Sequence, residues 1–85
     1  MKITVKLFGT LQLDTGVREM QLDVKEIKDI YAPLYKEAKE KRPETPVTEK
    51  DLKDCLIAVN GVRASKKAKL NDGDIVYLMT AVAGG

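Results

Sequence analysis

The last two residues, Gly84 and Gly85, are the part of the chain best suited to chemistry. Glycine has no Cβ, so a Gly-Gly end is narrow and conformationally free, and its terminal carboxylate can enter the active site of another protein. Residues 81–85 would reach ~16 Å when extended, at ~3.3 Å per residue. The alternative is a frayed terminus without a function. The strand pattern directly before the glycines favours the chemical interpretation.

The other side chains offer little catalytic chemistry. The sequence contains no histidine, which excludes His-based triads, His general bases and His metal ligands. Cys55 is the only cysteine, so it forms no internal disulfide and no structural zinc site. Cys55 adjoins a predicted apolar strand, and this favours a buried, inert thiol over a sulfur-carrying one. Because the sequence has no nucleophile–base pair and no phosphate-binding loop, we expect partner proteins to supply the catalysis.

Length and charge limit the remaining possibilities. A chain of 85 residues forms one domain. Its 15 Lys and Arg against 13 Asp and Glu give a formal net charge of +2, which argues against a dedicated nucleic-acid binder. No apolar run approaches the ~20 residues of a membrane span, and residues 1–6 alternate instead of forming a signal peptide. We therefore expect a cytoplasmic protein that binds neither nucleic acid nor membrane.

The N-terminal half of the chain predicts a hairpin followed by a helix. Alternating apolar residues predict strands over 3–8 and 19–24, joined by a turn over 11–16. Helical spacing of apolar residues then runs over 27–38, with Asp23 as the predicted N-cap. Pro33 lies inside this pattern and predicts either a kink or two short helical pieces that share one apolar face. The helix should end near residue 42, because Pro43 disfavours helix at the residue before it.

The C-terminal half predicts mostly strands. Thr48 and Asp51 are placed like the two partners of a capping box, which predicts a short helix over 49–54. Asn60-Gly61 is the strongest hairpin signal in the chain. Asp72-Gly73-Asp74 has too few carboxylates for a calcium loop and predicts a turn. The strands are expected over 56–59, 62–64 and 75–80.

The predicted order of elements is β-β-α-(short α)-β-β-β. A right-handed crossover would place the third strand parallel to a strand of the first hairpin, and one helix on one face of a mixed sheet closes a core of this size. This is an α+β arrangement of the β-grasp, or ubiquitin-like, type, formed by residues 1–80 and followed by a flexible Gly-Gly tail, 81–85. We expect apolar residues of all the main elements to form one core: Ile3, Val5, Leu7, Leu22, Ile27, Ile30, Leu34, Leu56 and Leu78.

Strand alternation also predicts an exposed apolar surface. If the apolar residues of the first strand face the helix, Phe8 faces the opposite side of the sheet. Val76 and Leu78 of the last strand would then point inward, and Tyr77 and Met79 outward with Ile75. An exposed apolar patch commonly marks a partner surface. The opposite register of the last strand remains open on the pattern alone.

Four short blocks, spread over the whole chain, carry a resemblance to a known family. They are Val5-Lys6-Leu7-Phe8-Gly9, Val59-Asn60-Gly61, Leu70-Asn71-Asp72-Gly73-Asp74-Ile75-Val76 and Val82-Ala83-Gly84-Gly85. With these blocks the sequence resembles the MoaD/ThiS family of ubiquitin-like sulfur carriers, most closely the small subunits of molybdopterin synthase. It departs from those subunits at Met79-Thr80-Ala81, where Phe-Pro-Pro is common, and in a longer, Lys/Glu-rich central segment.

The resemblance implies a carrier cycle at Gly85, with Gly84 beside it. A ubiquitin-activating-like adenylyltransferase would use ATP to form a C-terminal glycyl adenylate. A persulfide donor would then replace AMP with sulfur and leave a C-terminal thiocarboxylate, 1-thioglycine. The large subunit of molybdopterin synthase would transfer that sulfur to a pterin precursor in molybdenum or tungsten cofactor synthesis. The chain itself would be no enzyme and would bind no cofactor or metal.

The resemblance also implies which residues meet partners. The family uses apolar residues at the positions of Phe8 and Met79, next to which strand alternation places Tyr77. Arg63 lies at a further contact position although it is charged. Val82 and Ala83 would enter the partner with the glycines. Three other functions stay open: a sulfur carrier for thiazole or tRNA thiolation, a protein modifier joined to lysines through Gly85, and a plain binding module whose glycines do no chemistry.

Overall fold

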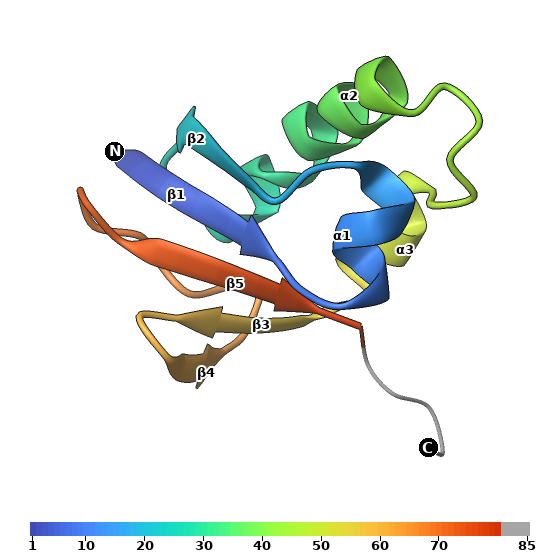
Figure 1. Ribbon diagram of the computed structural model, residues 1–85. Helices are drawn as coiled ribbons and strands as arrows, with labels where there is room; N and C mark the ends of the chain where they lie inside the picture. Colours follow the sequence, from blue (N-terminus) through green and yellow to red (C-terminus); the bar gives the residue numbers. More distant parts are fainter. Residues whose placement is uncertain (81–85) are drawn as a thin grey trace.

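A five-stranded mixed sheet with α2 crossing one of its faces forms the body of the protein (Figure 1). The computed structural model describes residues 1–80. In chain order the elements are β1 (Lys2–Leu7), α1 (Thr10–Thr15), β2 (Glu19–Asp23), a 3₁₀ helix (Ile27–Asp29), α2 (Tyr31–Lys41), α3 (Glu49–Lys53), β3 (Leu56–Val59), β4 (Val62–Ala64) and β5 (Ile75–Met79). The predicted α+β, β-grasp fold is confirmed.

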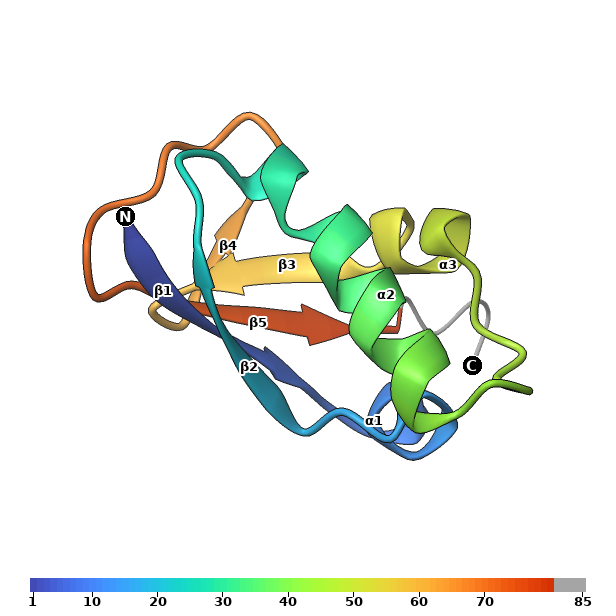
Figure 2. The same ribbon diagram turned by 90° about the horizontal axis from the view of Figure 1, so that it is seen from above.

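The strand order in the sheet is β2-β1-β5-β3-β4. The central pair, β1 and β5, is parallel, and the other pairs are antiparallel. We expected the third strand to run parallel to a strand of the first hairpin. In the sheet β3 pairs only with β4 and β5, and the parallel contact to the hairpin is made by β5. The crossover through α2 and α3 therefore does not place β3 next to β1. The last strand, β5, lies between them (Figure 2).

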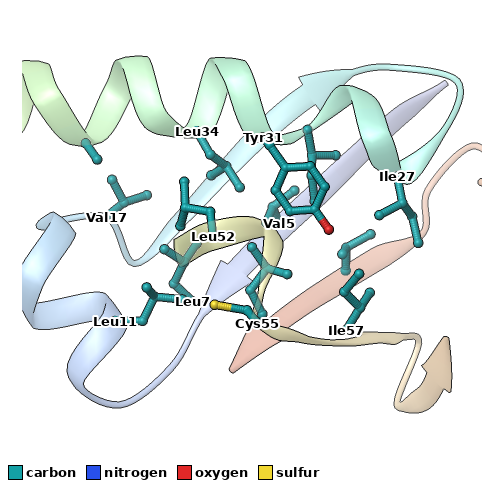
Figure 3. Packing of buried hydrophobic residues seen from close by; sticks show 14 of the residues in the cluster. Val5, Leu7, Leu11, Val17, Ile27, Tyr31, Leu34, Leu52, Cys55 and Ile57 are labelled. Carbon is teal, nitrogen blue, oxygen red and sulfur yellow. The ribbon is translucent and has the colours of Figure 1, made fainter. Parts of the chain in front are cut away.

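The core lies between the sheet and α2, and most of its predicted members are confirmed (Figure 3). Leu22 is partly buried against this core. The prediction for Leu56 is wrong: Leu56 is half-buried on the other face, and its neighbour Ile57 packs in the core opposite Leu78. The predicted residues that are at most 3% exposed are Ile3, Val5, Leu7, Ile27, Ile30, Leu34 and Leu78.

The connection between β1 and β2 is a short helix, α1, and not the predicted turn. Two glycines with positive φ bracket it, Gly9 at 62° and Gly16 at 73°. Leu11 and Thr15 lie one helical turn apart and are both buried, and the Thr15 hydroxyl donates a 2.7 Å hydrogen bond to the Leu11 carbonyl. The helix forms because its buried residues close the end of the core beside α2.

The main helical segment consists of two pieces, as one of the two predicted arrangements requires. The break falls at Ile30, between the 3₁₀ helix and α2, and not at Pro33. Pro33 is the third residue of α2, where its missing N–H is not needed for an intrahelical hydrogen bond. Asp23 is not the N-cap: Glu26 and Asp29 form a capping box, while Asp23 accepts a 2.9 Å hydrogen bond from the N-terminal amine.

The predicted end of α2 and the predicted start of α3 are confirmed, and α3 ends one residue earlier than predicted, at Lys53. α2 ends at Lys41 with Arg42 as its C-cap. At the start of α3 the Thr48 hydroxyl accepts a hydrogen bond from the Asp51 N–H at 3.1 Å, and the Asp51 carboxylate accepts one from the Thr48 N–H at 2.9 Å. Across residues 1–80, the helices are all too short or too polar to traverse a bilayer.

We expect Leu7→Ala to lower the free energy of unfolding by ~2–5 kcal/mol, because Leu7 is 3% exposed and its removal leaves a cavity. Leu13 is 68% exposed on α1, so Leu13→Ala should change stability by no more than ~0.5 kcal/mol. Urea denaturation of both variants measures the difference. Equal stability of the two variants would contradict the assignment of the core face.

Tyr31 provides a second test of the core. Its side chain is 1% exposed, and its hydroxyl has no hydrogen-bond partner within residues 1–80. Burial, and to a lesser degree the charge of the nearby Cys55 thiolate, raises the pKa of Tyr31 to about 12. Since an unfolded tyrosine titrates near ~10, stability should fall as the pH rises from ~10 towards 12.

We therefore expect Tyr31→Phe to be at least as stable as the wild type at pH 7, because it removes an unpaired buried hydroxyl. Above pH ~10 the variant should be clearly the more stable of the two, because it has no phenol to ionise. Thermal denaturation at pH 7 and pH 11 measures both effects, with Tyr35→Phe on the half-buried side of α2 as the control. A less stable Tyr31→Phe variant at pH 7 would show that the hydroxyl has a partner.

Candidate functional site

The central strand β5 leads directly to the predicted reactive end of the chain. β5 lies between β1 and β3 and ends at Met79, and Thr80 is the last described residue (Figure 1). Residues 81–85 lie outside the described residues. The predicted roles of Val82, Ala83, Gly84 and Gly85 therefore stay predictions, and the candidate site within residues 1–80 consists of the surfaces next to Thr80.

The sheet face away from α2 carries the predicted aromatic surface. Phe8 is 43% exposed and stacks on Tyr77, with ring centroids 5.5 Å apart and an angle of 21° between the planes. Val76 and Leu78 are fully buried, whereas Tyr77 and Met79 are half-buried on the opposite face. The outward register of β5 is confirmed, and the alternative register is wrong.

The pairing of β5 with β3 adds one residue to this surface that the sequence did not indicate. Leu56 pairs with Met79 and shares its face. Its only sequence signal was membership of the apolar run 56–59, which does not show which way a side chain points. We call the surface of Phe8, Leu56, Ile75, Tyr77 and Met79 the outer apolar patch.

Arg63 lies on the same face as the patch. The cross-strand pairs place Lys6 opposite Tyr77, Tyr77 opposite Ala58, and Ala58 opposite Arg63. Ala58 is small and only 6% exposed, so the larger side chains of Tyr77 and Arg63 lie on either side of it along this line of cross-strand pairs. The structure thus brings all four predicted contact residues within 1–80 to one face of the sheet.

Cys55 is the only nucleophilic thiol, and its surroundings suppress its ionisation. It is 8% exposed, and its thiol donates a 3.3 Å hydrogen bond to the Asp51 carbonyl. Burial raises the pKa of Cys55, and the carboxylates of Asp51 and Asp54 raise it further. The inert interpretation of this residue is supported, although Cys55 lines a pocket of about 340 Å³ together with Thr80.

The turn Asp72-Gly73-Asp74 is a structural feature. The Asp74 carboxylate accepts hydrogen bonds from the Asn60 side-chain amide at 2.9 Å and the Asn71 N–H at 2.8 Å. The Asn60 side-chain oxygen accepts one from the Ile75 N–H at 2.9 Å. Two of the four resemblance blocks therefore meet at the start of β5, far from Thr80. In the described part of the chain no group of three or more Cys, Asp and Glu side chains is arranged to hold a metal ion.

Comparison with protein families gives a match to the ThiS family over residues 5–85. A comparison with curated protein sequences gives no match. Among solved structures, the putative molybdopterin converting factor subunit 1 from Pyrococcus furiosus is 28% identical, with a TM-score of 0.68 over 96% of this chain and 99% of that chain.

Two further structures share the fold. SAMP1 from Haloferax volcanii is 24% identical, with a TM-score of 0.71 over the whole of both chains. A chain in the complex of subunits 1 and 2 of the molybdopterin-converting factor from Helicobacter pylori is 23% identical, with a TM-score of 0.62, again over the whole of both chains. At these identities the likeness carries the fold alone.

We expect Phe8→Asp and Met79→Asp to weaken binding of the adenylyltransferase that the family resemblance implies at least ~10-fold, because each places a charge in the outer apolar patch. Neither side chain belongs to the core, so both variants should stay folded. Val62→Asp is the control, since Val62 is 69% exposed and pairs with Val59, which packs on the core side of the sheet. Calorimetric titration measures the affinities, and normal binding by both patch variants would place the contact elsewhere.

Proposed function

This chain belongs to the ThiS family of ubiquitin-like sulfur carriers, and from that premise we propose that Gly85 is adenylated and then thiocarboxylated. The observation that carries the proposal is the family match, which extends over residues 5–85 and so includes the glycine pair. The described residues add a reason to assign the chemistry to the terminus, because their one thiol is buried and kept protonated.

The proposed chemistry takes place on the terminal carboxylate in three steps. A carboxylate oxygen attacks the α-phosphate of ATP, pyrophosphate leaves, and an acyl adenylate forms. The terminal sulfur of a persulfide then attacks the acyl carbon, and AMP leaves. A second thiolate finally attacks the donor's sulfur in this acyl disulfide, so that a disulfide forms between the two thiols and the thiocarboxylate leaves. The partner enzymes supply ATP, the persulfide and the thiol, so this chain needs no cofactor of its own.

Within this cycle we assign the outer apolar patch to partner binding. An aromatic pair with an adjacent methionine and leucine resembles the apolar centre of a transient protein interface. The patch consists of residues of β3 and β5 and of Phe8, which directly follows β1, and β5 leads to the terminus. A partner bound to the patch therefore lies next to Thr80, the last described residue before the terminal segment 81–85.

The sulfur acceptor we propose is the precursor of molybdopterin, and the chain would act as the small subunit of molybdopterin synthase with a large catalytic subunit. This is supported by the similarity to the Pyrococcus furiosus converting-factor subunit, at 28% identity over nearly the full length of both chains. The proposal includes a cytoplasmic location, where ATP and persulfide donors are available.

A protein modifier is the second candidate. It is favoured by the fold similarity to SAMP1, which is described as a small archaeal modifier protein. The activated terminus would then be joined to a lysine of a target protein. Adenylation of Gly85 is common to both candidates, and they separate only at the acceptor. A carrier for thiazole or tRNA thiolation would differ from the leading proposal only in the molecule that accepts the sulfur.

We expect deletion of Gly85 to abolish ATP-dependent adenylation, and addition of one residue after Gly85 to do the same. In both variants the reactive carboxylate no longer lies where the enzyme holds it. The melting temperature should not change, because the core formed within residues 1–80 does not include Gly85. Pyrophosphate release by the purified adenylating enzyme measures the first step, and the appearance of the thiocarboxylate measures the two steps that transfer sulfur.

Cys55→Ala is the control for this experiment, because the Cys55 thiol is buried and protonated in the folded protein. It should leave both adenylation and sulfur transfer intact. Sulfur transfer by the extended protein, or its loss in Cys55→Ala, would contradict the proposed mechanism.

A further inference from the structure

A small hollow adjoins the outer apolar patch on the side of β2. It has a volume of about 210 Å³ and lies between the aromatic pair and the chain that joins β1, α1 and β2. Phe8 and Tyr77, stacked on each other, contribute its apolar lining. The other lining residues are Lys6, Leu7, Gln12, Arg18 and Glu19.

The charges around this hollow are unbalanced. Lys6 and Arg18 contribute two cations, and Glu19 contributes one carboxylate. Lys6 and Glu19 are cross-strand partners, yet within residues 1–80 no ion pair joins them, and Arg18 has no ion pair there either. The hollow therefore presents an unneutralised positive charge beside an aromatic wall.

We propose that this hollow receives an acidic side chain of the partner protein that covers the outer apolar patch. The inference rests on the proposed function, because it takes the patch as the surface that meets the adenylating enzyme. A glutamate or aspartate fits the lining, since its carboxylate can lie between the Lys6 ammonium and the Arg18 guanidinium. Its methylene groups would pack on Phe8 and Tyr77.

The rest of the face agrees with such a partner. Arg63 flanks the patch on the opposite side, two strands beyond Tyr77. Cations therefore lie on both sides of an apolar centre, and they favour a partner surface whose own apolar centre has an acidic rim. Charges in this arrangement speed association and exclude partners with a basic rim.

The test measures the affinity of the adenylating enzyme for neutralised variants at two salt concentrations. Lys6→Gln and Arg18→Gln should each weaken binding ~3-fold, and the double variant ~10-fold, with a smaller effect of salt than in the wild type. Glu19→Gln should tighten binding, because it removes the competing carboxylate. Lys36→Gln is the matched control, because Lys36 is exposed on α2, away from the patch.

Each outcome decides the inference. Weaker binding by the Lys6 and Arg18 variants, with Lys36→Gln unchanged, supports it. Wild-type affinity and salt dependence in the double variant would overturn the inference alone, provided that the wild type is adenylated. An equal loss in Lys36→Gln would also overturn it, because net charge would then explain the effect. A wild type that neither binds nor is adenylated would overturn the proposed function as well.

Discussion

The parallel pairing of β1 with β5 is the constraint on which the rest of the structure depends. It places Val5 beside Val76 and Leu7 beside Leu78, and so fixes which side chains of both strands face α2. Because side chains alternate along a strand, the same register turns Phe8 and Tyr77 to the outer face. A slip of one residue would exchange the two faces of β5 and remove both the core and the patch.

The two ends of β5 have different roles. At its start, Asp74 and Asn60 use their side chains to hold the β3–β4 turn against the entry to β5. At its end, Thr80 lines a pocket together with Cys55, whose pKa is raised by burial and further by the carboxylates of Asp51 and Asp54. A body that is held by side-chain hydrogen bonds at one end of β5 and is chemically inert at the other suits a carrier that reacts through its C-terminal residue.

Local patterns predicted the strands, the Thr48 cap and the Asn60-Gly61 hairpin, because neighbouring residues determine these features. The local patterns failed where contacts between residues far apart in the sequence determine which side chains are buried. Ile57 rather than Leu56 enters the core because β3 pairs with β5, and a run of four apolar residues does not reveal this. The outward patch residues followed from alternation, whereas the hollow beside them depends on Arg18, which belongs to no strand and gave no sequence signal.

The central claim is that Gly85 carries sulfur, and the mass of the intact protein tests it most directly. The protein is isolated from its own cells without reducing agents, and its mass is measured together with that of its C-terminal peptide. The account predicts a fraction of molecules in which one sulfur replaces one oxygen, located at Gly85. Branched adducts that join Gly85 to lysines of other proteins, with no thiocarboxylate, would contradict it and identify a modifier instead.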